Sequence, residues 1–359
     1  MTTRFSRFLI PVLFLSVVAS SCSDDSNASS ESSPTTSGSI SVSSASTVAP
    51  TTTAVPATTV DPPSIPGVQS VMVNGAGPTD AFDDHLQAVA NTDEDGPFYM
   101  VNLLDFAEIA HYPDDSEFAG STGLEANERY DAASSVEIAA VGGELVFAGS
   151  VNEIVIGDGI EWDLVAIVRY PSRQSILDLR ANEEFGAAVV HKWASLDHTF
   201  ALVTDEIDLG PAAGLPPVDP ANAPYPPTGD DAPFTMFHLI NFHDTAQYED
   251  GEAPDDAPIS GREAVGRYSA NAGVAALPLG IRPSGWFDVI VPAIGDGRQW
   301  DEARLNPFPS RETFEVLTSD PTWAEGTFHR SAGIEETYAI MLNPMIWRPE
   351  LVGSNGSAE

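Results

Sequence analysis

Two histidines are the residues of this chain that are best placed to do chemistry. His191 and His329 lie 138 residues apart, and each is followed directly by a basic residue. An imidazole in a cleft could act as a general base, as a proton shuttle or as an axial ligand of haem. A histidine could equally cap a helix end or bond a backbone carbonyl, and a duplication would retain such a structural residue in both copies. A catalytic and a structural role therefore both stay open for His191 and His329.

A second pair of polar side chains interrupts two strongly apolar stretches. Asn102 and His238 fall on the same side of their stretches as Met100 and Met236, if the stretches are strands. A polar group in such a place needs a hydrogen-bonding partner, so it either lines a pocket or is satisfied by a neighbouring strand. We take Asn102 and His238 as candidate ligand-binding residues.

The two histidines close a longer pattern that the chain contains twice. The copies are Ile156-Gly157-Asp158-Gly159-x-x-Trp162-Asp163 followed by Pro171-Ser172-Arg173, and Ile294-Gly295-Asp296-Gly297-x-x-Trp300-Asp301 followed by Pro309-Ser310-Arg311. The offset stays at 138 residues without a gap from 156 to 204. Repetition at a domain-sized period indicates a duplicated structural unit.

The tryptophans and arginines of this pattern complete the set of candidate ligand contacts. Trp162 and Trp300 follow a glycine turn, where an indole could line a site or simply close the end of a barrel. Arg173 and Arg311 could bind an anionic ligand through two parallel hydrogen bonds, or form an ion pair with a nearby carboxylate.

Several kinds of chemistry have no support in the sequence. Cys22 is the only cysteine, which excludes disulfides within the chain, thiolate metal sites and a cysteine nucleophile. No hydrolase, zinc-protease or phosphate-loop motif occurs. The acidic loops at Asp114-Asp115 and 249–256 lack the alternating spacing of a calcium loop, although calcium binding there stays open. We predict no metal site and no cofactor.

Charge excludes a further class of partner. The chain has 53 acidic and 15 basic residues, a formal net charge of −38, and Lys192 is its only lysine. Such a surface repels phosphates, so we expect no nucleic-acid partner.

The N-terminal region has the pattern of an exported protein. Residues 1–21 combine a basic start, a short apolar run and small residues, which predicts a signal peptide. Cys22 follows directly and resembles the lipidated cysteine of a bacterial lipobox, with ordinary signal cleavage as the alternative. Residues 22–66 are rich in Ser, Thr and Pro, so we expect a disordered tether. The predicted location is the cell envelope, with lipid anchoring at Cys22, or secretion as the alternative.

The rest of the chain divides into two copies of one set of elements. We predict a first repeat at 67–205 that includes an N-terminal extension, a Pro- and Gly-rich linker at 206–232, a second repeat at 233–345 and a tail at 346–359. In the first repeat the patterns predict strands at 98–104, 145–155, 163–170 and 200–203, and helices at 125–141 and 173–193, the latter either continuous or broken near Asn182. This βαββαβ order gives a four-stranded antiparallel sheet with two helices on one face.

These residues resemble a known family, domain-of-unknown-function family 1330. The resemblance rests on Met100-Val101-Asn102-Leu103-Leu104, Gly123, Tyr130, Gly142-Gly143, Ile156-Gly157, Trp162-Asp163, Tyr170-Pro171-Ser172-Arg173 and His191-Lys192. It is looser in the second repeat, where His238 replaces Asn102 and Ile281 replaces the second glycine. The resemblance implies a ferredoxin-like unit of the dimeric α+β barrel superfamily, whose members include cofactor-free oxygenases and haem enzymes, so the fold alone does not decide function.

The predicted fold is α+β, with two tandem ferredoxin-like repeats whose sheets pack as an intramolecular dimeric α+β barrel, and hence a monomeric pseudo-dimer. The first functional hypothesis is a small, partly apolar ligand bound in the barrel. The second is a cofactor-independent oxygenase or isomerase that uses His191 or His329 with Asn102 or His238, and the third is haem binding by one of these histidines. Whether the chain is an enzyme stays open, and the first repeat, which keeps more of the family residues, is the better place for a site.

Overall fold

The computed structural model describes residues 96–210 and 215–352. All of the described residues belong to one compact unit. The signal peptide, Cys22, the tether and the extension before residue 96 all lie outside the described residues, so the predictions for them stay predictions.

The two halves of the chain repeat one order of elements. The first half contains β1 (Phe98–Phe106), α2 (Gly123–Ala140), β2 (Glu144–Ile156), β3 (Leu164–Tyr170), α3 (Arg173–Arg180), α4 (Glu183–Ser195) and β4 (Leu196–Glu206). The second contains β5 (Phe234–Phe242), α5 (Gly261–Ala276), β6 (Gly285–Ile294), β7 (Glu302–Phe308), α6 (Arg311–Thr318), α7 (Pro321–Gly333) and β8 (Ile334–Trp347). The described residues also contain the short 3-10 helices η2 (Pro220–Asn222), η3 (Leu277–Leu279) and η4 (Pro349–Leu351). The predicted βαββαβ order is confirmed in both halves.

Local side-chain chemistry explains where the helices begin and end. Thr122 and Glu125 form a reciprocal capping box that starts α2, and Gly142, with a φ of 76°, follows its end. The second helix of the first half is broken near Asn182, one of the two alternatives from the sequence, because the side chain of Asn182 accepts a hydrogen bond from Phe185 N and starts α4. A Cβ atom at Gly123 would collide with the carbonyl oxygen atoms of Ala107 and Ser195, so only glycine fits at the start of α2.

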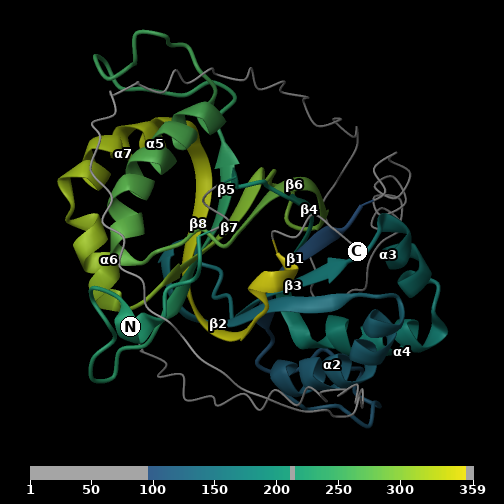
Figure 1. The fold of residues 1–359 in the computed structure, drawn as a ribbon. Helices are drawn as coiled ribbons and strands as arrows, with labels where there is room; N and C mark the ends of the chain where they lie inside the picture. Colours follow the sequence, from purple (N-terminus) through teal and green to yellow (C-terminus); the bar gives the residue numbers. More distant parts are fainter. Residues whose placement is uncertain (1–95, 211–214, 353–359) are drawn as a thin grey trace, which may run out of the picture. The chain divides into compact units, whose positions relative to one another are not determined.

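The eight strands close into one barrel. Their order is β1-β3-β2-β8-β5-β7-β6-β4, and every pair is antiparallel. Two seams join the halves, β2 with β8 and β4 with β6, and these seams are equivalent because β2 corresponds to β6 and β8 to β4. The predicted fold class is confirmed: the chain forms a pseudo-dimeric α+β barrel from two ferredoxin-like halves (Figure 1).

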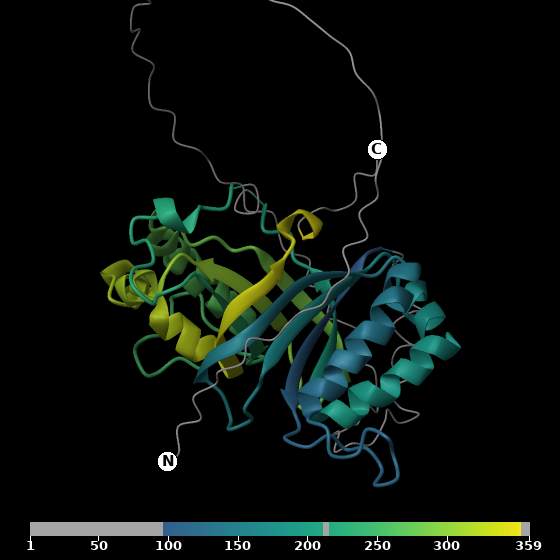
Figure 2. The same ribbon diagram turned by 90° about the horizontal axis from the view of Figure 1, so that it is seen from below.

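The barrel has a filled interior and two outer helical layers. Val101 and Leu103 on β1 point inwards and are fully buried with the inward side chains of the other strands. Their neighbour Met100 packs instead among the side chains of α3 and α4. Helices α2, α3 and α4 lie on one flank of the barrel, and α5, α6 and α7 lie on the opposite flank (Figures 1 and 2). Each half therefore encloses a second apolar layer between its sheet and its helices.

The predicted tail begins later than residue 346. Strand β8 runs to Trp347, whose ring lies 5.6 Å from that of Phe147, and the hydroxyl of Tyr99 donates to Leu351 O at 2.9 Å. The apolar side chains of this stretch cover one end of the barrel, which the sequence pattern after Pro344 did not indicate.

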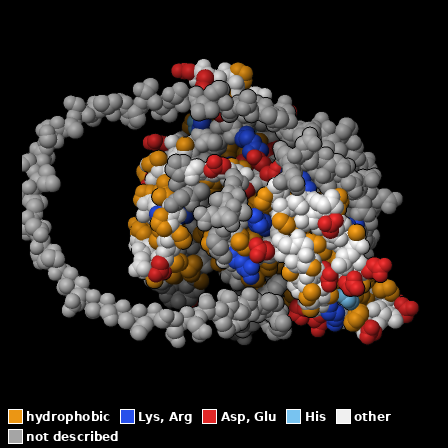
Figure 3. Space-filling model, turned by 45° about the vertical axis from the view of Figure 1, so that its right-hand side comes forward, with side chains coloured by type: hydrophobic (Ala, Val, Ile, Leu, Met, Phe, Trp, Pro, Cys, Tyr) orange, Lys and Arg blue, Asp and Glu red, His pale blue; other side chains and the backbone are white. Residues whose placement is uncertain are grey.

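Acidic side chains are spread over the surface and gather at one lower corner of the face in Figure 3. In the part of the chain that the structure describes, no helix has the length and apolar character needed to cross a membrane.

Candidate functional site

The aromatic side chains of the two copies of the duplicated pattern lie together at one end of the barrel. The ring of Trp162 lies 4.9 Å from Phe200, and the ring of Trp300 lies 5.5 Å from Tyr338. Contacts across the halves join Trp162 to Tyr338 at 6.1 Å and Phe200 to Trp300 at 6.0 Å. Because Trp162 and Trp300 are only 2% and 4% exposed, they close the barrel end together with Phe200 and Tyr338, which is the structural alternative to ligand contact that the sequence offered.

Arg298 covers this aromatic cluster. Its Nη2 atom lies 2.8 Å from Asp158 Oδ2 of the first half and 3.0 Å from the Tyr338 hydroxyl, and its Nε donates to Asp296 at 2.7 Å. The guanidinium carbon is 5.1 Å from the centre of the Trp300 ring. The first copy carries Ile160 at this position, so a single arginine ties the two glycine turns together.

The aspartates of the pattern hold the ends of the first strands. Asp163 accepts a hydrogen bond from Phe106 N, and Asp301 accepts one from Phe242 N, both at 2.7 Å. The equal geometry in the two halves supports a structural role for both aspartates.

His191 and His329 each pair with a tyrosine from the loop that follows the first strand of their half. The Nδ1 atoms of His191 and His329 lie 2.6 Å from the hydroxyl groups of Tyr112 and Tyr248, respectively. Burial lowers the pKa of both imidazoles. Among the described residues, neither histidine hydrogen-bonds to Asn102 or His238. The fold therefore does not form the catalytic pairs of a histidine with Asn102 or His238 that the sequence suggested.

Arg173 and Arg311 form ion pairs. Arg173 is buried, and its Nη2 lies 2.9 and 2.8 Å from the carboxylate oxygen atoms of Asp205. Arg311 Nη1 donates to Glu153 Oε2 of the first half at 2.9 Å, while Asp231 accepts from the Arg311 amide.

Arg311 also borders an open depression of about 640 Å³ between the halves. The depression is lined by Asn152, Asp230, Asp231, Ala232, Phe234, Arg311, Glu312, Glu315 and Asn343. Four carboxylates face one paired arginine there, which disfavours an anionic ligand.

Asn102 meets a residue that the sequence did not single out as a site. Lys192 Nζ donates to Asn102 Oδ1 at 3.4 Å, and the amide of Asn102 donates to Met100 O at 3.1 Å and Ala166 O at 3.4 Å. The amine also lies 5.6 Å from the centre of the Tyr130 ring. The side-chain amide of Asn102 therefore bonds both the lysine and two backbone carbonyl groups. It holds the amine in the layer between β1, α2 and α4.

The surroundings of Lys192 shift two ionisable groups towards neutrality. Burial lowers the pKa of Lys192 to about 8, although the charge of Asp131 opposes this shift. Burial likewise raises the pKa of Asp131 to about 7, opposed by Lys192 and by a hydrogen bond of 3.0 Å from Asn127. An amine and a carboxyl group with such close pKa values can both gain and lose a proton near pH 7 to 8.

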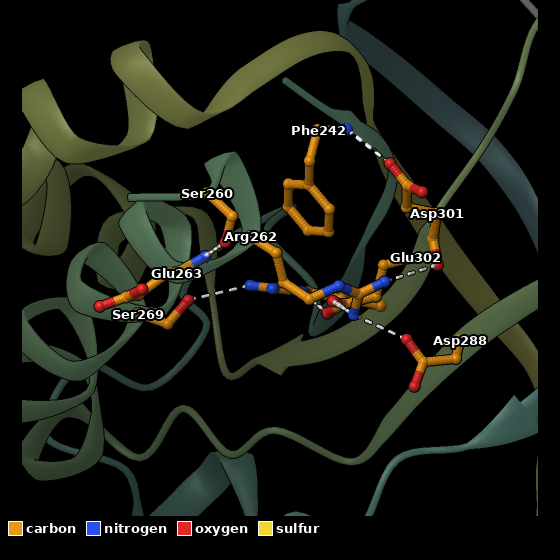
Figure 4. A network of polar contacts seen from close by, with 9 residues as sticks. Phe242, Ser260, Arg262, Glu263, Ser269, Asp288, Asp301 and Glu302 are labelled. Carbon is orange, nitrogen blue, oxygen red and sulfur yellow. Dashed lines mark hydrogen bonds and ion pairs between the residues drawn. The ribbon is translucent and has the colours of Figure 1, made fainter. Parts of the chain in front are cut away.

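The second half carries different groups at the equivalent positions. His238, Ser269 and Arg330 stand where the first half has Asn102, Asp131 and Lys192. Ser269 accepts a hydrogen bond of 2.9 Å from Arg304. Arg304 also bonds the buried Glu302, which Arg262 reaches at 3.0 Å while it contacts Asp288 at 2.6 Å (Figure 4). The acid–base pair is thus confined to the first half.

A signal for Lys192 was present in the sequence. Ala188 and Lys192 are four residues apart on α4, as are Asn127 and Asp131 on α2, so each pair shares one face of its helix. Ala188 is buried. A lysine on the same face departs from the apolar pattern of a helix face that packs on a sheet, and helical spacing could have shown this.

Two observations concern metal and haem ligation. In residues 96–210 and 215–352, no group of three or more His, Cys, Asp or Glu side chains could hold a metal ion. The tyrosine bond leaves only Nε2 of His191 and His329 for an iron atom.

Comparisons with known proteins give structural matches alone. No protein-family model matches the chain, and no curated protein matches it, so the resemblance to family 1330 stays a prediction. A protein of unknown function from Rhodopseudomonas palustris is 28% identical, with a TM-score of 0.32, over 35% of this chain and 92% of that chain. An anthrone oxidase-like protein is 12% identical, with a TM-score of 0.41, over 70% and 92% of the two chains. The chlorite dismutase of Candidatus Nitrospira defluvii in complex with imidazole is 12% identical, with a TM-score of 0.37, over 73% and 95%. At these TM-scores we draw no functional conclusion from the matches, and the fold assignment rests on the closed strand order.

Proposed function

We propose that the first half is a cofactor-independent acid–base site for a small, partly apolar compound, of the isomerase or oxygenase type. The observation that carries the proposal is Lys192. The only lysine of the chain is held by Asn102 and has a pKa lowered to about 8, beside a carboxyl group whose pKa is raised to about 7.

In this proposal the unprotonated amine of Lys192 takes an acidic proton from the bound compound. A carbonyl compound with an acidic α-hydrogen or a phenol supplies such a proton. Asp131 stabilises the ammonium group that forms, and Asn102 positions the amine. Return of the proton to a different atom is an isomerisation, and reaction of the resulting anion with oxygen is an oxygenation.

The ligand of this site lies in the layer between sheet and helices, and not in the barrel interior where the sequence-based hypothesis placed it. The inward positions hold fully buried large side chains such as Tyr99, Phe237 and Phe287. Around Lys192 the neighbours in the layer include Phe185, Trp193 and Met100, which suits an apolar part of the ligand.

Location and assembly are part of the proposal. The N-terminal pattern supports an envelope protein anchored through Cys22. Both barrel seams form within one chain, which supports a monomer, and light scattering would give the mass of one chain.

Screening in D₂O tests the activity. Enolisable ketones, quinols and phenols are incubated with the protein, and proton exchange is followed by NMR and oxygen uptake by electrode. We expect Lys192→Met to lower the rate about 10²- to 10⁴-fold, while Arg348→Met, which also removes one positive charge, leaves it unchanged. Equal rates for the wild type and Lys192→Met would contradict the proposal, and loss of activity in His191→Ala alone would favour the histidine instead.

A further inference from the structure

Arg330 is a cation without a counter-ion in a strongly acidic protein. Its guanidinium makes no hydrogen bond or ion pair within the described residues, although it lies near the end of α7 and is partly buried. Other arginines of the same half are paired: Arg262 with Asp288 and Arg267 with Asp256. With 53 acidic residues in the chain, Arg330 differs from Arg282, which has no carboxylate partner but bonds two backbone carbonyl groups, and from Arg348, which is exposed.

His238 offers a second unused polar group in the same layer. Its Nδ1 atom is buried and has no hydrogen-bond partner in the described part of the chain. Burial, followed by the charges of Arg330 and Arg304, lowers the pKa of the imidazole to about 3. The imidazole is therefore neutral at physiological pH and keeps one N–H donor that a ligand could use.

The first half shows what has changed around Arg330. There the ammonium group of Lys192 has Asp131 as its opposing charge, and Ser269 replaces that carboxylate in the second half. Arg304 stands at the place of Ala166, but its charge is offset by the buried Glu302. At the equivalent place, the charge of Asp131 acts on Lys192 in the first half, whereas the second half has no carboxyl group at that helix position.

We propose that Arg330 and His238 form a binding site for the carboxylate of a small anionic molecule in the helical layer of the second half. A guanidinium presents two parallel N–H groups that match a carboxylate, and the buried nitrogen of His238 supplies a further polar contact. This site is distinct from the acid–base site at Lys192.

NMR of the His238 imidazole tests this site directly. The full chain is labelled with ¹⁵N-histidine, its signals are assigned with His238→Asn, and acetate or benzoate is added at constant ionic strength. We expect saturable movement of the His238 signals with at least one of these carboxylates, and none with acetamide or benzamide.

The affinity of variants for the carboxylate then tests whether Arg330 supplies the positive charge of the site. Arg330→Gln should weaken binding about tenfold or more, as expected for the loss of a charge-assisted hydrogen bond. Arg330→Lys should weaken it less, because it keeps the charge without the fork, and Lys192→Gln at the equivalent position of the first half should leave it unchanged. No saturable movement with either carboxylate, or equal affinity in Arg330→Gln, would overturn the proposal without touching the proposal for Lys192.

Discussion

The Nζ atom of Lys192 lies 3.4 Å from Oδ1 of Asn102, which joins the C-terminal turn of α4 to the middle of β1. Both residues face a layer whose side chains are mostly apolar, with Asp131 as a further ionisable group. Burying a polar pair at this place costs free energy unless each group is satisfied. Asn102 meets that condition because its NH₂ group donates to two backbone carbonyls. Lys192 donates to Asn102 alone, so its amine has further N–H groups that are not bonded within the described residues.

Substitution of the two tryptophans should separate the contribution of the ring from that of the N–H group. Neither Nε1 atom has a hydrogen-bond partner in the described residues. Trp162→Ala or Trp300→Ala should therefore lower the free energy of unfolding by about 3–5 kcal/mol through the cavity that it leaves. Trp162→Phe or Trp300→Phe should cost about 1–3 kcal/mol, because a six-membered ring stays, the smaller side chain leaves a smaller cavity and no hydrogen bond is lost. Urea denaturation measures both, and a phenylalanine variant as unstable as the alanine variant would mean that the indole N–H is bonded.

Arg298 should couple the two halves of the barrel. A double-mutant cycle with Arg298→Met and Asp158→Asn should give a coupling free energy of about 0.5–1 kcal/mol, modest because the pair is partly exposed to solvent. The coupling should fall at high salt. Glu312→Gln, which has no contact with Arg298 among the described residues, serves as the control partner and should show none. A coupling of zero for Asp158 would mean that this ion pair does not stabilise the junction.

Much of the fold could be predicted from the sequence, because the duplication fixed the repeat and the strand alternation fixed the order of elements. Asn182 as a helix start and Phe234–Phe242 as a strand follow from local chemistry alone. The site could not be read in the same way. Whether Lys192 or His191 faces the sheet depends on the packing of α4 on β1, and the partners of His191 come from a loop 79 residues earlier.

The lipid anchor is tested by Cys22→Ser, since this cysteine is the only thiol of the chain. We expect the wild-type protein in the membrane fraction and the variant in the soluble fraction after export, because the thiol that would carry the lipid is gone. Retention of Cys22→Ser at the membrane would show that something other than Cys22 holds it there.

The stability of the folded chain should rise with pH between about 8 and 10.5, the pKa of Lys192 in the fold and its ordinary value. In this window the unfolded chain still binds the proton that the folded chain has lost, so a higher pH favours the fold. Lys192→Met should remove this contribution, and chemical denaturation at several pH values gives the slope. An unchanged slope in the variant would place the folded pKa near the ordinary one.

Titration of the single lysine tests the central claim most directly. Selective ¹⁵N-lysine labelling of the full chain gives one side-chain NMR signal, that of Lys192. We predict a midpoint near pH 8, and a lower midpoint in Asp131→Asn because the negative charge of Asp131 raises the pKa of the amine. A midpoint near 10.5 that does not respond to Asp131→Asn would contradict the acid–base site.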